Sequence, residues 1–181
     1  MKVYAMIADG TEEIECLCVV DVLRRAGIDV TLTSVCGERV VSSHGIEISA
    51  DAVIDDVDMS DADMIFIPGG MPGTLKLAQC DKLISAVKAA LQCGKRVAAI
   101  CAAPAHVLGA NGLLRGKRAV CYPGHEGLMQ GRVPCDERVV TDGLITTAKA
   151  MGCSLELGLE IVKLLAGEEC AKTVSASVLA R

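Results

Sequence analysis

Aromatic residues are almost missing from this sequence: its 181 residues include no Trp, two Tyr and one Phe. Hydrophobic residues still make up 51% of the chain, so an aliphatic core containing Met and Cys is expected. Basic residues number 18 against 23 acidic ones, and they form no cluster. Without a basic patch or stacking aromatics, the chain lacks the features of a nucleic-acid-binding surface. We therefore expect no nucleic acid partner.

Long apolar runs and targeting signals are missing as well. No stretch approaches the ~18 apolar residues of a membrane-spanning helix, so we expect no membrane partner. Residues 1–5 (MKVYA) resemble the start of a strand rather than a secretory signal, which predicts a cytoplasmic protein. No linker, repeat or low-complexity stretch interrupts the chain. We expect residues 1–181 to form a single domain.

Cysteine, in contrast, is abundant. The ten cysteines are irregularly spaced, and none of them forms a CxxC pair. Zinc sites use paired, convergent thiolates, so the spacing predicts no metal site. In a reducing cytoplasm most of these thiols would serve as small core residues. A reactive cysteine must then be recognised by its local sequence.

The apolar pattern predicts an α/β fold. Residues 3–8 and 64–67 are continuous apolar runs, typical of parallel strands covered on both faces, and residues 96–100 (RVAAI) are expected to form a further strand. Amphipathic segments expected to be helical alternate with them, at 12–26, 82–93 and 154–166. This alternation predicts a doubly wound, mostly parallel sheet with helices on both faces. Residues 40–41 and 46–48 are expected as short edge strands, and 111–136 as the least regular segment.

Three strand ends carry the candidate chemistry. The first strand leads through Asp9-Gly10-Thr11 to Glu15, the third ends at Pro68-Gly69-Gly70, and the fourth ends at Cys101. Ligands of open parallel sheets bind beyond the carboxyl ends of the strands. If these strands are neighbours, an acid, free backbone N–H groups and a thiol meet in one crevice.

Cys101 has the sequence context of a nucleophile. It lies between an apolar strand and a helix start, followed by Ala102-Ala103-Pro104. A sharp strand-to-helix turn exposes its central side chain, and the helix N-terminus favours a thiolate. N–H groups there and around Gly69 and Gly70 could bind an oxyanion. The competing interpretation is a buried cysteine packed like alanine.

Glu15 and the histidines can be interpreted in more than one way. Glu15 could point into the crevice with a raised pKa and move a proton, or it could simply complement the helix dipole. His125, after Tyr122-Pro123-Gly124, could reach a pocket or lie solvated in its loop. His106 is expected inside the fold, and His44 lies near an expected edge.

Four segments resemble the ThiJ/PfpI (DJ-one) family, in its DJ-one/ThiJ branch. They are AMIADGTEEIE (5–15), IFIPGGMPG (65–73), AAICAAP (98–104) and DGLITTAKAMG (142–152). The resemblance implies a flavodoxin-like α/β sandwich and a homodimer. It also implies that Cys101 is the reactive cysteine, Glu15 the acid that hydrogen-bonds its sulfur, and Gly69, Gly70 and Ala102 the backbone donors.

Some positions depart from the family pattern. Ala102 stands where the protease-like branch has a His, which argues against a peptidase. Tyr122 stands where some members carry a His, and His125 follows three residues later. His44 replaces an Arg near the anion site, and residues 150–153 (AMGC) replace a Gly-Pro-Gly-Thr stretch. Tyr122, His125 and His44 are therefore candidate pocket residues.

Three functions compete for the same site. The first is a cofactor-free glyoxalase or protein deglycase, in which Cys101 forms a hemithioacetal with methylglyoxal-type dicarbonyls or acts on their protein adducts. The second is an oxidative-stress sensor or chaperone, in which Cys101 is oxidised to a sulfinate without turnover. The third is a binding module in which Cys101 is inert.

Overall fold

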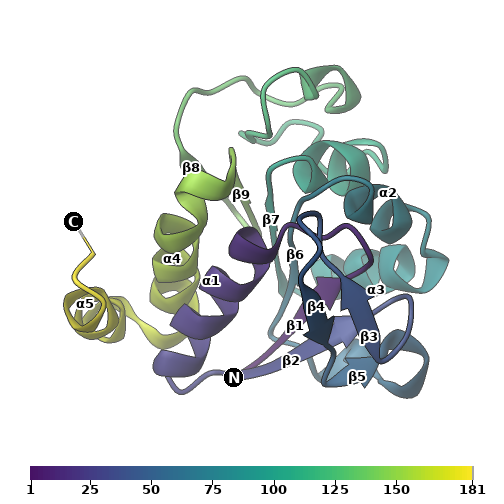
Figure 1. Cartoon of the computed structure of the whole chain (residues 1–181). Coiled ribbons are helices and arrows are strands. Elements are labelled where there is room, and N and C mark those ends of the chain that lie inside the picture. The colour runs from purple at the N-terminus through teal and green to yellow at the C-terminus, as the bar shows by residue number, and fades with distance from the viewer. Residues whose placement is uncertain (181) are drawn as a thin grey trace.

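The computed structural model describes residues 1–180 and is built around a seven-stranded sheet (Figure 1). In spatial order the strands are β5 (Ala52–Val53), β2 (Asp29–Ser34), β1 (Lys2–Ile7), β6 (Met64–Ile67), β7 (Arg96–Ile100), β9 (Ile145–Ala148) and β8 (Val139–Asp142). All neighbours pair in parallel except β8 and β9, which are antiparallel. The predicted doubly wound, mostly parallel sheet is confirmed.

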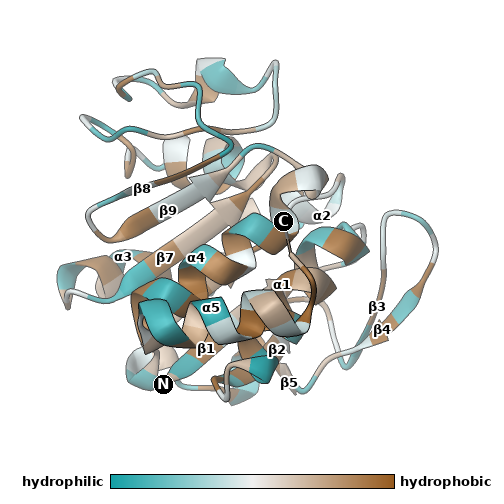
Figure 2. Cartoon of the chain, turned by 90° about the vertical axis from the view of Figure 1, so that its left-hand side faces the viewer, coloured by the Kyte–Doolittle hydropathy of each residue, from teal (hydrophilic) through white to brown (hydrophobic). Residues whose placement is uncertain are grey.

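Helices cover both faces of this sheet. One layer holds α1 (Glu13–Arg25), α4 (Ser154–Ala166) and α5 (Glu168–Ser177), and the other holds α2 (Gly73–Ala78), α3 (Asp81–Gln92) and the π-helix η3 (Pro104–Gly109). Figure 2 shows α1 and α4 side by side, with hydrophobic and hydrophilic residues alternating along them. The amphipathic helices predicted from the sequence are thus present.

Strand β1 explains why the apolar runs are continuous. Its residues Val3, Ala5 and Ile7 pack into the core under α1 and α4, whereas Tyr4 and Met6 pack into the core under α3. A strand covered on both faces has no solvent side, so every position of β1 after Lys2 is apolar. Gly158 of α4 lets the two helices approach closely, because a Cβ there would lie 3.1 Å from Val22 of α1.

A small hairpin stands apart from the main sheet. Its strands β3 (Arg39–Val41) and β4 (Glu47–Ser49) pair only with each other in the described part of the chain, so they are not edge strands of the main sheet. The hairpin is tied to the β1–α1 loop by backbone bonds from Gly10 to Val41 (2.7 Å) and from Ser43 to Thr11 (2.9 Å). It therefore lies beside the end of β1 (Figure 1).

The segment 111–136 is irregular, as expected, and lies over the carboxyl ends of the strands (Figure 1). The Tyr122 N–H donates to the Cys101 carbonyl (2.7 Å), which fixes the segment to the end of β7. Short 3-10 helices complete the chain: η1 (Ile54–Asp56), η2 (Met59–Asp61), η4 (Glu126–Leu128) and η5 (Met151–Cys153). Among the described residues, no helix has the length and apolarity needed to cross a membrane.

Candidate active site at the end of strand β7

Cys101 occupies the sharp turn that the sequence predicts after β7. Its φ of 64° lies in the left-handed region, which costs a non-glycine residue on the order of 1 kcal/mol. Two backbone hydrogen bonds hold it there: its N–H donates to Ala148 (3.0 Å), and its carbonyl accepts from Tyr122. The side chain is partly exposed. Backbone strain held by neighbouring strands is common at reactive positions.

Glu15 reaches this turn from the first turn of α1. The Glu12 side chain caps the helix by accepting the N–H of Glu15 (2.6 Å), so the helix begins where the acid can turn inward. The Glu15 side chain is buried, with the residue only 1% exposed. Its Oε2 accepts the Gly69 N–H at 3.0 Å. The carboxyl also bonds the Met151 N–H and the Cys101 side chain.

Gly69 is the contact between the acid and the sulfur. A Cβ on this residue would lie 2.4 Å from Oε2 of Glu15 and 2.6 Å from Cβ of Cys101. Neither distance is tolerated, so only glycine allows both side chains to close over this position. The PGG motif therefore brings the acid and the thiol together.

Burial makes Glu15 an acid that titrates near neutrality. Loss of solvation, reinforced by the negative charge of Glu12, raises the pKa of Glu15 to about 7, although Cys101 and the Gly69 and Met151 N–H groups oppose this. Such a carboxyl can both accept and return a proton at physiological pH.

The sulfur is coupled to this acid. Burial and the negative charge of Glu15 raise the pKa of Cys101 to about 12, while the Ala102 and Gly70 N–H groups lower it. The expected thiolate therefore does not follow from the helix N-terminus alone. When Glu15 is protonated, its charge no longer opposes the thiolate and its O–H can donate to the sulfur. The two groups titrate as a pair, and proton loss near pH 7 leaves one negative charge shared between them.

The three predicted backbone donors have two different partners. The N–H of Gly69 is occupied by Glu15, whereas those of Gly70 and Ala102 face the sulfur. Gly70 has φ +93° and packs so closely that a Cβ would lie 2.2 Å from the Glu12 nitrogen. Gly70 and Ala102 therefore remain the candidate oxyanion donors.

The hydrogen bonds of the histidines in residues 1–180 go to groups other than Cys101. Nδ1 of His125 lies 2.9 Å from Nε2 of His106, and the two rings meet edge-on. Burial and the neighbouring His125 lower the pKa of His106. Tyr122, whose ring is exposed, stacks edge-on against His125 at 6.1 Å. This arrangement gives no support to a peptidase triad, and it leaves Tyr122 and His125 near the turn as candidate substrate contacts.

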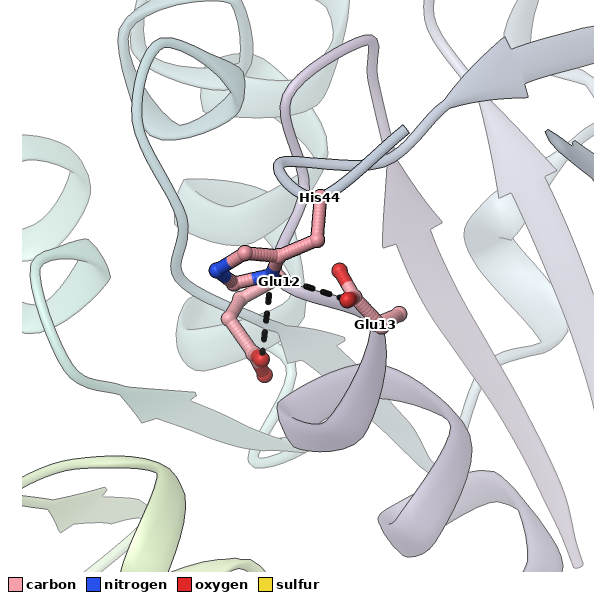
Figure 3. Close-up of side chains that lie close together, drawn as sticks. All are labelled: Glu12, Glu13 and His44. Atoms are coloured by element: carbon pink, nitrogen blue, oxygen red, sulfur yellow. Dashed lines mark hydrogen bonds and ion pairs between the residues drawn. The ribbon is translucent and has the colours of Figure 1, made fainter. Parts of the chain in front are cut away.

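His44 is directed at two acids rather than at the sulfur. Its Nδ1 lies 2.8 Å from Oε1 of Glu13 and 4.0 Å from Oε1 of Glu12 (Figure 3). Sequence reasoning did not pair these residues, because 31 positions separate Glu13 from His44. It also missed the Met151 N–H that bonds Glu15.

The geometry defines an α/β protein with a cysteine–glutamate site at a strained strand-to-helix turn. The sequence profile of the DJ-1/PfpI family matches residues 1–164. The chain therefore belongs to the DJ-1/PfpI family, which confirms the resemblance found in its motifs.

Curated relatives and solved structures agree with this assignment. Protein DJ-1 homologs B and A of Arabidopsis thaliana are 41% and 39% identical over 99% and 98% of the chain. The chain spans only 42% and 46% of their own lengths. "Toxoplasma gondii DJ-1, oxidized" superposes with a TM-score of 0.95 at 37% identity, covering 98% of this chain and 97% of that one. A Caenorhabditis elegans relative, "Glutathione-independent glyoxalase DJR-1.2", is 34% identical over 89% of this chain and 86% of its own length.

Proposed function

We propose that this protein converts methylglyoxal-type dicarbonyls into 2-hydroxy acids without glutathione, metal or other cofactor. The observation that carries the proposal is the buried Glu15 carboxyl against the Cys101 side chain, with both closing over Gly69. A nucleophile beside a base of near-neutral pKa is suited to carbonyl addition followed by proton transfer. The glyoxalase name of the Caenorhabditis elegans relative supports the same chemistry.

The reaction can be written with these groups alone. Sγ of Cys101 adds to the aldehyde carbon, and the thiol proton passes through Glu15 to the new alkoxide, giving a hemithioacetal. The N–H groups of Gly70 and Ala102 stabilise the oxyanion. Glu15 then removes the proton from the former aldehyde carbon, which gives an enediol, and delivers it to the adjacent carbon. The hydroxyl proton of the first carbon moves to the neighbouring oxygen, and the product is a thioester. Water hydrolyses the thioester, releasing lactate from methylglyoxal and restoring the thiol.

We extend the proposal to adducts of these dicarbonyls with protein thiols and amines, which carry the same two-carbon unit. The partly exposed Cys101 and the exposed Tyr122 support access from outside. We also propose a cytoplasmic setting, supported by the ten free cysteines, and a homodimer. Exposed apolar side chains on one side of α1, Ile14 and Leu17, support the dimer, since such patches mark interfaces.

Purified protein given methylglyoxal in the absence of glutathione is expected to produce lactate, because the site needs no added cofactor. Proton NMR measures the product directly. The matched control is Cys101→Ser, which keeps the size of the side chain but removes the thiol. Lactate no higher than in this control would reject the enzymatic proposal.

A second candidate function uses the same sulfur as an oxidation sensor. It is favoured by the partial exposure of Cys101 and by the oxidised state named for the Toxoplasma gondii relative. Protonated Glu15 and the Ala102 N–H could hold a sulfinate by hydrogen bonds.

Mild peroxide is expected to add two oxygens to Cys101 before any of the other nine cysteines. Intact-mass spectrometry followed by peptide mapping locates the modification, and Cys36, which is exposed, serves as the internal control. Oxidation spread evenly over the cysteines would count against the sensor. Turnover of methylglyoxal decides whether sensing is the main role.

A further inference from the structure

Three side chains with metal-binding atoms converge beside the active site, and one of them, Glu12, also caps the helix at Glu15. Glu12 and Glu13 come from the N-terminus of α1, and His44 comes from the loop between β3 and β4 (Figure 3). One ligand atom from each residue lies within 4.8 Å of the other two. Among residues 1–180 this is the one group of three or more His, Cys, Asp or Glu that meets this condition.

The separations suit a single ion. Nδ1 of His44 lies 2.8 Å from Oε1 of Glu13 and 4.0 Å from Oε1 of Glu12. Ligand atoms about 2.1 Å from a shared metal ion stand roughly 3 Å apart, so the observed distances bracket the required spacing. A small rotation of the His44 ring toward Glu12 would make the two Nδ1–Oε1 distances more nearly equal.

The second carboxylate oxygen of each glutamate accepts a hydrogen bond from another group, and these bonds orient the two carboxylates. Oε2 of Glu12 accepts the Glu15 N–H, and Oε2 of Glu13 accepts the Ser43 hydroxyl at 3.3 Å. The two Oε1 atoms are therefore the ones presented to the imidazole. Ligands held by such outer hydrogen bonds are pre-oriented for a metal.

The carboxylate of Glu13 is buried and the imidazole of His44 is exposed, a combination that suits a metal site. The Glu13 side chain is only 8% exposed, and a buried carboxylate needs a cation or hydrogen-bond donors beside it. The His44 side chain is 68% exposed, which leaves an open side for water ligands and for entry of the ion. The positive end of the α1 dipole disfavours a cation, but two full carboxylate charges outweigh a partial charge.

We propose that Glu12, Glu13 and His44 bind one divalent transition-metal ion, with water completing its coordination. Two carboxylates and an imidazole match Mn²⁺ and Zn²⁺ better than Ca²⁺, which prefers oxygen ligands alone. The ion would join the hairpin to the start of α1, next to the Gly70 backbone that faces the sulfur. Its role is to fix the hairpin beside the β1–α1 loop.

Manganese is the discriminating probe, because thiolates favour softer metals and the ten cysteines compete little for it. Titration of the full-length protein with MnCl₂, followed by the EPR signal of free Mn²⁺, is expected to show one bound ion per chain. His44→Ala and Glu13→Gln should each weaken binding by at least about tenfold. His125→Ala, which removes a histidine from a different cluster, should bind as the unaltered protein does.

Thermal unfolding with and without Mn²⁺ provides a second readout. The ion should raise the melting temperature of the unaltered protein and of His125→Ala, but not that of His44→Ala. Since His44 is mostly exposed, its variant is expected to fold, and circular dichroism checks this. Absence of binding, or binding that His44→Ala leaves unchanged, would overturn the proposal.

Discussion

Glu15→Gln is expected to lower methylglyoxal turnover at least about 100-fold while leaving Cys101 open to alkylation. The amide keeps the shape of the carboxyl, can still accept the Gly69 N–H and can still donate to the sulfur. It cannot carry a proton between the two carbons of the substrate. Loss of turnover with retained thiol reactivity would therefore separate proton transfer from positioning.

The pH profile gives this prediction a second measurement. Because the pKa of Glu15 is raised to about 7, kcat/KM of the unaltered protein should rise with pH through a midpoint near that value. Glu15→Gln should lose the midpoint. Glu38→Gln, at an exposed acid away from the site, is the matched control. Full activity in Glu15→Gln would remove Glu15 from the mechanism.

The same substitution is expected to stabilise the fold at alkaline pH, by up to about 3 kcal/mol. Burial raises the pKa of Glu15 from 4.5 to about 7, so the folded state holds this proton more tightly than the unfolded state. The stability that the protonated carboxyl contributes is complete below pH 4.5 and is lost as the pH rises through 7. A glutamine has no such charge to bury.

Urea unfolding in the presence of a reductant, at about pH 4.5 and about pH 8, measures this difference. The gain of Glu15→Gln over the unaltered protein should be large at the higher pH and close to zero at the lower one. Glu38→Gln should show no gain at either pH. A gain of equal size at both values would mean that packing, rather than charge, explains it.

The core of the fold follows from the sequence because its signals are local. Residues 3–8, 64–67 and 97–100 are apolar without interruption, which by itself indicates strands between two helical layers. The pairing of the hairpin was harder to predict, because the sequences of short strands such as 39–41 and 47–49 look alike whether the strands join a sheet edge or pair only with each other. Its place is set by hydrogen bonds to Gly10 and Thr11, far away in the sequence.

The site was predictable where it depends on strand ends and unpredictable where it depends on pairing across the fold. The position of Cys101 after an apolar strand was sufficient to predict the sharp turn. The length of the chain between Glu13 and His44, or between His106 and His125, gave no sign that these side chains meet. The ionisation of the sulfur could not be predicted either, because the burial and the facing acid that raise its pKa belong to the tertiary structure.

The left-handed backbone of Cys101 has an evolutionary consequence. At φ 64° a glycine would be relaxed and an asparagine tolerated, whereas cysteine is kept at a cost in conformational energy. Descendants that abandoned the sulfur chemistry would gain from replacing it, so drift to Gly or Asn at this one position would mark the lineages in which selection for reactivity had ceased.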